Sequence, residues 1–363
     1  MPGVYVSYPF CNQKCTFCNF ASGVASGQRR SVYEQALLRE IQQHRWQWLP
    51  ETVYFGGGTP SLMHPSVLKD VLTAIPSSAL VELTLECAPG TLSPEQVAEW
   101  VRSGVNRVSL GVQSFEEVEL RHTGRHHTAE VVESDLELLR SCGITDINLD
   151  LIAGLPHQTS QSWANSLQWI ERLSPTHVSV YLFEVDEDSR LGKEILTGGT
   201  RYSAGFLPSE DAAAEFYESG VDRLSALGYR RYEISNFAQP GFESVHNLKY
   251  WHLEPYVGFG LDAHSYDRNF RWGNPDNLQA YLRYSESGNA GEREKVDAVE
   301  ERFFVGLRLT DGIRPTAAEW SRFASPIHKW TELGMLEQDN GALRLSPKGV
   351  LISNEVFQEF LNV

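Results

Sequence analysis

The 363-residue chain has little positive charge, few cysteines and no long hydrophobic segment. Its 31 Lys and Arg residues stand against 47 Asp and Glu residues, a formal net charge of −16. An overall basic surface for nucleic acid is therefore excluded. No stretch approaches the ~20 apolar residues of a membrane-spanning helix, and Met1–Phe10 lacks the basic start and apolar core of a signal peptide. We expect a cytoplasmic protein, with peripheral membrane contact left open.

The cysteines are odd in number and unevenly spaced. They are Cys11, Cys15, Cys18, Cys87 and Cys142, and the first three fall within eight residues. An odd number argues against a disulfide framework in a reducing compartment. We interpret Cys87 and Cys142 as small buried apolar residues. Hydrophobic residues make up 41% of the chain and charged residues 21%, as in a folded globular protein.

Apolar, β-rich segments alternate with amphipathic ones over the first 229 residues. The expected strands are Val4–Tyr8, Thr52–Phe55, Leu80–Glu86, Arg107–Val112, Asp146–Ile152 and His177–Phe183. The expected helices are Val32–Trp48, Pro65–Ile75, Pro94–Arg102, Ala129–Arg140, Ser162–Leu173 and Glu210–Ala226. Six such units imply a parallel sheet with helices outside, but they are too few for a closed eight-unit barrel. We expect an α/β fold, a partial (β/α)6-type TIM barrel, with ligand-binding residues at the carboxyl ends of the strands.

Two regions follow this partial barrel, which we assign to 1–229. Residues 230–292 are irregular and rich in aromatic residues, Asn, Gly and Pro, and we expect them to cover the barrel. Residues 293–363 are expected to form a small winged-helix-like domain. Its expected elements are helices at Glu300–Leu309 and Ala317–Leu333, a hairpin at Met335–Leu345 and a last helix at Pro347–Leu361. Because this segment is not basic, packing or partner binding is favoured over DNA binding.

The most specific motif is Cys11-x3-Cys15-x2-Cys18, directly after the first expected strand. Three thiolates on one loop can hold three irons of a 4Fe–4S cluster and leave the fourth iron open to a small molecule. Zinc is the competing interpretation, but a structural zinc site requires four ligands. His44, the nearest histidine, lies on an expected helix without a standard spacing. Unligated structural cysteines are the third alternative, and spacing and context favour the cluster.

With the aromatic Phe17 before the last cysteine, this motif resembles the signature of the radical S-adenosylmethionine (SAM) superfamily. In that superfamily the open iron chelates the methionine end of SAM, and reduction of the cluster yields a 5′-deoxyadenosyl radical. From Tyr5 to at least Ser265 the sequence is similar to the oxygen-independent coproporphyrinogen III oxidase-like family. The resemblance implies bound SAM and a 4Fe–4S cluster on the three clustered cysteines.

The resemblance also implies which residues contact SAM. They are Tyr5, Phe17, Gly57, Gly58, Thr59, Glu86, Gln113, Arg125 and Asp150. Glu86, Gln113 and Asp150 would bind ribose hydroxyls or the methionine amino group, and Arg125 would pair with the methionine carboxylate. Taken singly, these residues have simpler interpretations, such as a surface or capping residue or a solvated basic turn. The glycine-rich segment would be a plain turn after a strand, and it lacks the Lys-Ser/Thr ending of a phosphate loop.

Two features separate the branches of this family. Decarboxylating members resemble C-x3-C-x2-C-x-C, and this chain has Phe20 at the position of the fourth cysteine. They also carry an N-terminal extension that helps to close the site, and we expect no room for one before the first strand. The Cys18-Asn19-Phe20 ending is instead similar to that of the heme chaperone branch, called HemW. Decarboxylation of coproporphyrinogen is therefore not expected.

A second motif agrees with this branch. His246-Asn247-Leu248-Lys249-Tyr250-Trp251 matches H-N-x-x-Y-W, for which the resemblance implies heme binding. Imidazole is a common axial ligand of heme iron, Tyr250 and Trp251 offer flat apolar surfaces, and Lys249 could meet a propionate. The alternative is an aromatic segment that packs on the barrel, with His246 only hydrogen-bonded. The resemblance favours heme at His246, Tyr250 and Trp251.

We therefore expect a heme chaperone that binds heme and transfers it to acceptor proteins, with a 4Fe–4S cluster and SAM. An oxygen-independent coproporphyrinogen III oxidase, or another radical SAM enzyme that modifies porphyrins, is the first alternative. A radical SAM enzyme acting on RNA is the second. The missing fourth cysteine weighs against the first alternative, and the low positive charge weighs against the second. Nucleic acid is not an expected partner, and whether the chain is an enzyme stays open.

Overall fold

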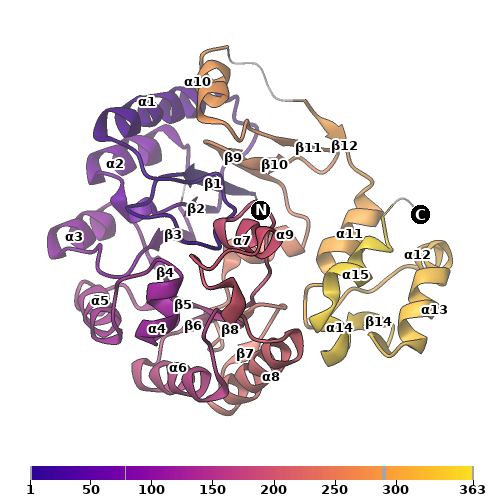
Figure 1. The fold of residues 1–363 in the computed structure, drawn as a ribbon. Helices are drawn as coiled ribbons and strands as arrows, with labels where there is room; N and C mark the ends of the chain where they lie inside the picture. The colour runs from indigo at the N-terminus through magenta and orange to yellow at the C-terminus, as the bar shows by residue number, and fades with distance from the viewer. Residues whose placement is uncertain (1, 78, 288–291, 362–363) are drawn as a thin grey trace.

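A computed structural model describes residues 2–77, 79–287 and 292–361. Six parallel strands lie side by side in chain order at the centre of its sheet. They are β1 (Gly3–Tyr8), β2 (Thr52–Gly57), β3 (Glu82–Cys87), β4 (Arg107–Gln113), β5 (Asp146–Ala153) and β6 (His177–Leu182). Figure 1 shows helices around the outside of these strands. The α/β fold predicted from the sequence is confirmed.

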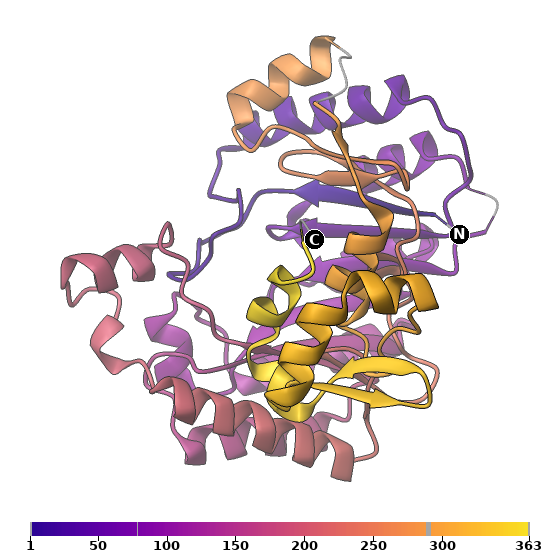
Figure 2. The ribbon, with the colours of Figure 1, turned by 90° about the vertical axis from the view of Figure 1, so that its right-hand side faces the viewer.

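Helices follow these strands and cover the outer face of the sheet, except for α7 (Arg190–Thr197), which directly follows β6 and lies beyond the strand ends (Figure 2). The helices of this part are α1 (Gly27–Gln43), α2 (Pro65–Ala74), α3 (Pro94–Arg102), α4 (Glu117–His122), α5 (Ala129–Ser141), α6 (Ser160–Leu173), α7 (Arg190–Thr197) and α8 (Glu210–Ala226), with 3-10 turns η1 (Pro60–Leu62) and η2 (Ala204–Phe206). The Ser26 side chain caps α1 by accepting a hydrogen bond from the backbone of Arg29. This cap starts α1 before the expected Val32, and the helix ends before Trp46 and Trp48.

Each central strand has an apolar face toward the helices and a polar face toward the inside of the partial barrel. In β1, Val4, Val6 and Tyr8 belong to the core under the helices, whereas Tyr5 and Ser7 line a cavity. Inward positions of β2–β6 are occupied by Thr52, Tyr54, Glu82, Thr84, Glu86, Arg107, Ser109, Gln113, Asn148, Asp150, His177 and Ser179. Because side chains alternate across a strand, the period of two gives this barrel a polar interior.

Residues 230–292, which the sequence assigns to a covering segment, extend the sheet at both edges. The added strands are β7 (Arg230–Arg231), β8 (Asn236–Ala238), β9 (Tyr256–Phe259), β10 (His264–Tyr266), β11 (Phe270–Gly273) and, just beyond this segment, β12 (Glu294–Lys295). β8 pairs with β6, and β9 runs parallel to β1 with Gly258 beside Tyr5. Helices α9 (Val245–Trp251) and α10 (Leu278–Ser287) connect these strands. The sequence predicts that the C-terminal domain begins at residue 293. Residues 288–291, just before this boundary, lie outside the described residues.

The C-terminal part contains helices and one hairpin. Its elements are α11 (Ala298–Gly306), α12 (Ala317–Arg322), α13 (Ala324–Glu332), β13 (Leu336–Asp339), β14 (Ala342–Leu345), α14 (Pro347–Leu351) and α15 (Ser353–Gln358). The hairpin lies where the sequence predicts it, but both long helices are divided. Phe323 separates α12 from α13 because Pro326 fits only in the first turn of a new helix, and Ile352 separates α14 from α15. The winged-helix-like shape stays a prediction.

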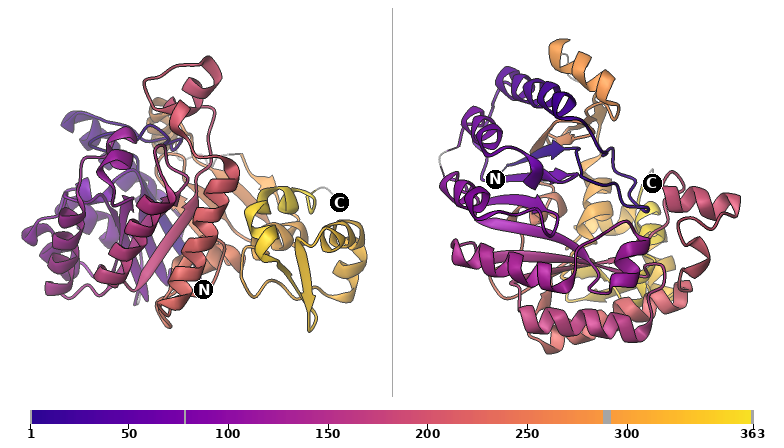
Figure 3. Two further views of the ribbon diagram at one scale, coloured as in Figure 1. Left: turned by 60° about the horizontal axis from the view of Figure 1, so that its bottom comes forward. Right: turned by 60° about the vertical axis from the view of Figure 1, so that its left-hand side comes forward.

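This C-terminal part packs beside the barrel, as Figure 1 shows in orange and yellow. The Arg308 guanidinium lies 3.3 Å from the buried carboxylate of Glu233 and ties the two parts together. On another side, α7 and η2 stand out beyond the carboxyl ends of the strands (Figures 2 and 3). The backbone N–H of Leu191 on α7 donates to the carbonyl of Thr16, at 2.9 Å, in the loop that carries the clustered cysteines. None of the described helices is both long and apolar enough to cross a membrane.

Candidate functional site

The clustered cysteines lie on the loop between β1 and α1. Cys15 is buried, Cys11 and Cys18 are half-buried, and all three have free thiols. The backbone N–H of Thr16 donates to the carbonyl of Thr123 at 3.1 Å, which fixes the loop to the end of α4. Among the described residues, no three His, Cys, Asp or Glu side chains converge as they would around one metal ion. A 4Fe–4S cluster binds each thiolate to a separate iron, and the three thiols line one cavity that could hold such a cluster.

A cavity of about 680 Å³, here called the cofactor cavity, lies at the carboxyl ends of the parallel strands. The three clustered cysteines line it together with most residues that the sequence predicts for SAM. These are Phe17, Gly57, Gly58, Thr59, Glu86, Gln113, Arg125 and Asp150. Tyr5 is the exception and lines a neighbouring cavity. The volume lies within the range of small-molecule sites, so the cavity brings the cysteines and eight predicted SAM contacts to one place.

Two carboxylates, Glu86 and Asp150, face this cavity from β3 and β5. Glu86 accepts hydrogen bonds from the Tyr54 hydroxyl at 2.9 Å and from the backbone N–H of Gly57 at 3.1 Å. Asp150 accepts one from the Asn148 amide at 2.7 Å. Burial, reinforced by the charge of Asp150, raises the pKa of Glu86 to about 7, and burial also raises the pKa of Asp150. A site with two such groups favours a ligand with positive charge or hydroxyl donors.

Arg125 and Gln113 are held in the cavity by local geometry. The Nε of Arg125 donates to Sγ of Cys15 at 3.1 Å, and its Nη1 donates to the carbonyl of Gly111 at 2.9 Å. In this structure Arg125 therefore supports the cysteine loop, and its contact with the methionine carboxylate stays a prediction. Gln113 has φ +70° where the pairing of β4 with β5 shifts register. Such a bulge turns a side chain to a new direction, here into the cavity.

The glycine-rich segment after β2 allows a close approach to the cysteine loop. A Cβ at Gly58 would lie 2.8 Å from backbone atoms of Tyr8, Pro9 and Phe10, so any other residue would push the loop away. Gly57 has φ +104°, which disfavours residues with a Cβ. The glycines are thus required by packing at the mouth of the cavity, which a plain turn would not predict.

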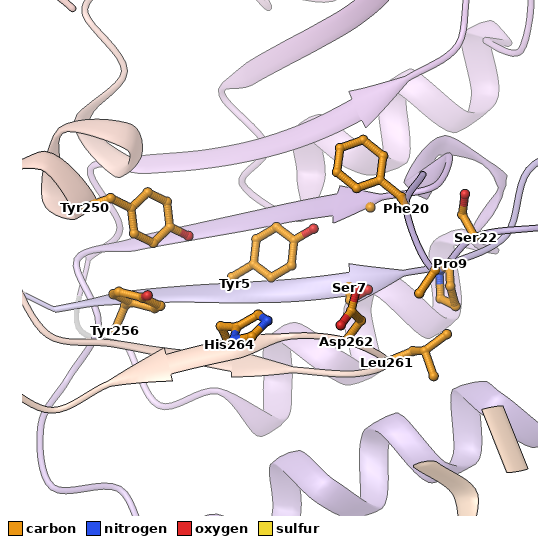
Figure 4. Close-up of a pocket in the computed structure, with 12 residues that line it drawn as sticks. Tyr5, Ser7, Pro9, Phe20, Ser22, Tyr250, Tyr256, Leu261, Asp262 and His264 are labelled. Atoms are coloured by element: carbon orange, nitrogen blue, oxygen red, sulfur yellow. The ribbon is translucent and has the colours of Figure 1, made fainter. Parts of the chain in front are cut away.

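A second cavity, of about 350 Å³, lies against β1 and is here called the aromatic cavity. Tyr5, Tyr250 and Tyr256 form its aromatic walls, and His264 from β10 lies beside Tyr256 (Figure 4). The other lining residues are Ser7, Pro9, Phe20, Ala21, Ser22, Gly57, Leu261 and Asp262. Phe20, Ser22 and Gly57 also line the cofactor cavity. The two cavities therefore meet at these three residues.

His246 of the H-N-x-x-Y-W motif lies on α9 and is only 1% exposed. Its Nδ1 lies 2.8 Å from the Thr52 hydroxyl, and its Nε2 lies 2.8 Å from the Tyr250 hydroxyl. The imidazole also stacks on Tyr54, with ring centroids 5.2 Å apart. Burial, together with the charges of Lys249 and Arg107, lowers the pKa of His246 to about 3. A neutral, buried imidazole with both nitrogens engaged has no free lone pair for iron in this conformation.

The other side chains of the motif point to different places. Lys249 is buried and pairs with Glu51 at 2.6 Å and with Glu254 at 3.3 Å, so it is not directed at a propionate. The Trp251 ring lies under the Arg308 guanidinium, 4.5 Å from its centroid, and lines a third cavity beside the C-terminal part. Only Tyr250 reaches the aromatic cavity. The structure does not bring His246, Tyr250 and Trp251 to one surface.

Several inward-facing residues escaped the sequence analysis. Glu82 on β3 accepts hydrogen bonds from the backbone N–H groups of Val245 at 2.7 Å and His246 at 3.3 Å, and so holds the start of α9. Arg107 on β4 is 2% exposed, and Tyr54 lies between Glu86 and His246. The available signal was a charged residue at an alternating position of a buried strand, as in Glu82-Leu83-Thr84-Leu85-Glu86.

Comparisons with known proteins show which families this sequence and this fold resemble. The radical SAM superfamily matches residues 5–170, and the HemN C-terminal domain matches residues 294–352. The heme chaperone HemW of Lactococcus lactis is 35% identical over 98% of this chain and 96% of its own. HemW of Bacillus subtilis is 34% identical over 99% of each. The structure of coproporphyrinogen III oxidase (HemN) from Escherichia coli, 22% identical, covers 99% of this chain and 90% of its own with a TM-score of 0.84, which shows the fold.

Proposed function

The chain belongs to the HemW family within the radical SAM superfamily, and on this premise we propose that it is a heme chaperone that binds heme and transfers it to acceptor proteins. Membership implies a 4Fe–4S cluster and SAM as its cofactors. The observation that carries the proposal is the junction of the cofactor cavity with the aromatic cavity at Phe20, Ser22 and Gly57. One cavity suits a charged small molecule, and the other suits a flat apolar one.

We assign the cluster to the thiolates of Cys11, Cys15 and Cys18, and SAM to the cofactor cavity. When bound, the cluster and SAM supply radical chemistry. The chain's own part is to orient SAM: the carboxylates of Glu86 and Asp150 would accept hydrogen bonds from its amino or hydroxyl groups. Burial raises the pKa of both carboxyl groups, and a cationic ligand beside them would favour their ionised forms. Gln113, Arg125, Phe17 and the glycine-rich segment complete the wall.

Heme is assigned to the aromatic cavity. Flat aromatic side chains contribute large apolar contact areas, and Tyr5, Tyr250 and Tyr256 supply them here. Tyr5, which the sequence assigns to SAM, would serve heme instead, because it faces this cavity. His246 would act through the hydrogen bond to Tyr250, while Trp251 would join the barrel to the C-terminal part.

The alternative activities have less support. The similarity to coproporphyrinogen III oxidase is at a level that carries the fold alone, and Phe20 stands where decarboxylating members have cysteine. The formal net charge of −16 opposes a broad RNA-binding surface. Both observations leave the heme chaperone as the function that the chain supports best.

The proposal is tested by a transfer assay. Protein with a reconstituted cluster and SAM is loaded with hemin under anaerobic conditions and mixed with heme-free cytochrome b562. We expect about one heme per chain and delivery to the cytochrome, followed through its Soret band. A hemin–albumin complex of similar affinity serves as the passive control, and Cys15→Ser tests the role of the cluster. Absence of stoichiometric heme binding, or delivery no faster than from albumin, would refute the proposal.

A further inference from the structure

The chain has 11 histidines, and among the residues that the structure describes His264 is the only one that lines the aromatic cavity. Its side chain is exposed rather than buried. Among the described residues, neither of its ring nitrogens has a hydrogen-bond partner. An imidazole with a free nitrogen at the edge of an aromatic cavity is chemically suited to bind a metal ion carried by a flat ligand.

The backbone around His264 makes room for its ring. β10 pairs antiparallel with β11, which places His264 opposite Gly273. A Cβ at Gly273 would lie 3.0 Å from Cε1 and 3.1 Å from Nδ1 of the imidazole, tighter than ordinary contact. The ring therefore rests on the glycine backbone. A larger residue at this position would force the imidazole out of its place in the cavity.

The two candidate histidines lie at different depths in the barrel. His246 contacts Thr52, which pairs with Gly3 at the start of β1. His264 lies beside Gly258, which pairs with Tyr5, two residues further along β1. At about 3.3 Å per residue this is a difference of about 7 Å along the strand. His264 is thus closer to the open end of the barrel.

We propose that His264 supplies the axial imidazole to heme iron in the aromatic cavity, and that His246 is a positioning residue that holds Tyr250 in the wall. This inference rests on the proposed function, because it names the iron ligand of that same heme site. Tyr250 meets Tyr256 edge-on, with ring centroids 4.6 Å apart, so its hydrogen bond to His246 fixes a corner of the cavity. A heme is larger than the cavity, and its propionate edge would extend into solvent.

The test is hemin titration of protein with its cluster in place. Difference spectra against the same protein without hemin, and electron paramagnetic resonance of the ferric heme, report the ligand. We expect His264→Ala to lose the imidazole-ligated low-spin signal and to bind hemin at least about tenfold more weakly. Added imidazole should restore the signal, because it replaces the missing ligand. His264→Gln should behave in the same way, and circular dichroism and iron content check that both variants fold.

Two variants separate ligation from positioning. His246→Gln should keep the imidazole-ligated signal with a loss of affinity of only about threefold, since the motif histidine does not touch iron. His252→Ala, at a solvent-exposed histidine next to α9, should match the unaltered protein. Retention of the signal in His264→Ala, or its loss in His246→Gln alone, would overturn the assignment. Failure of the unaltered protein to bind hemin would instead refute the proposed function, so the two failures are distinguishable.

Discussion

Replacement of Glu82 tests how the barrel holds the H-N-x-x-Y-W motif. This carboxylate is 4% exposed and accepts four hydrogen bonds. Its donors are the backbone N–H groups of Val245 and His246 and the hydroxyls of Ser244 and Thr84. The first N–H groups of a helix have no partner within the helix, and a negative charge there is favoured by the helix dipole. Glu82 therefore anchors α9, and through α9 it sets the place of Tyr250.

The expected cost of Glu82→Gln is about 3 kcal/mol of unfolding free energy. The glutamine NH2 group would face the Val245 N–H, now 2.7 Å from a carboxylate oxygen, and two donors would oppose each other. Burial lowers the pKa of Arg107, and the charges of two carboxylates, Glu82 and Asp146, raise it. Without the charge of Glu82, the buried Arg107 would keep only Asp146, at 3.5 Å. Removing one member of a buried charged pair costs about 3–5 kcal/mol, and losing a helix cap costs about 1 kcal/mol. The two effects overlap and do not add fully.

The assay is urea unfolding followed by circular dichroism, with Glu137→Gln as the control. Glu137 is an exposed helix residue, so that variant removes the same charge without a buried contact. Iron content should be unchanged in Glu82→Gln, because Glu82 begins β3 whereas the cysteine loop lies at the carboxyl ends of the strands. Hemin affinity should fall, because α9 no longer holds Tyr250. A stability loss no larger than about 0.5 kcal/mol, the size of an ordinary surface change, or unchanged hemin affinity, would refute this account of α9.

Three further predictions concern the cofactors and the reaction. Anaerobic reconstitution should load about four irons per chain. Serine at Cys11, Cys15 or Cys18 should prevent this loading, whereas Cys87→Ser should leave it unchanged. Stoichiometric zinc without cluster absorbance would contradict this prediction. Supplied with coproporphyrinogen III, SAM and reductant, the protein should form no protoporphyrinogen, and sustained release of carbon dioxide would restore the decarboxylase alternative. The pKa of Glu86 is raised to about 7, so SAM affinity measured by calorimetry should weaken as pH falls from 8 to 6, up to about tenfold per unit below 7. Glu86→Gln should reduce that dependence and leave the smaller part that belongs to Asp150.

The parallel strands could be predicted from the sequence because their signal is local. Val53 and Phe55 of β2, like Leu83 and Leu85 of β3, are buried under the helices and recur with period two. The cysteine motif is local as well, since one loop carries all three thiols. Its neighbours in space follow from a general property of parallel sheets, in which the carboxyl ends of the strands gather ligand-binding residues. This is why eight of nine predicted SAM contacts line one cavity.

The contents of the aromatic cavity could not be predicted in this way. Its aromatic walls come from β1, α9 and β9, and His264 comes from β10. These elements meet because β9 pairs with β1, from Gly3 beside Tyr256 to Val6 beside Phe259, and because Glu82 holds α9. The sequence pattern H-N-x-x-Y-W does not determine which of its side chains lie on the same surface. The helical turn of α9 puts His246 and Tyr250 in contact, four residues apart, and sends Trp251 elsewhere. Burial of His246 and exposure of His264 are tertiary facts without a local signal.

Phe20 lies between the cofactor cavity and the aromatic cavity and lines both of them. Its side chain is 63% exposed, although its carbonyl is held by the Lys14 ammonium at 2.9 Å. A single exposed aromatic residue is ordinary on a protein surface, but this one lines both cavities and would lose water contact when heme enters. A cysteine at this position would place a thiol in the same wall, whereas phenylalanine presents only apolar surface to both ligands. The residue that argues against decarboxylation in the sequence therefore also lies where the proposed heme site would adjoin the proposed cluster site.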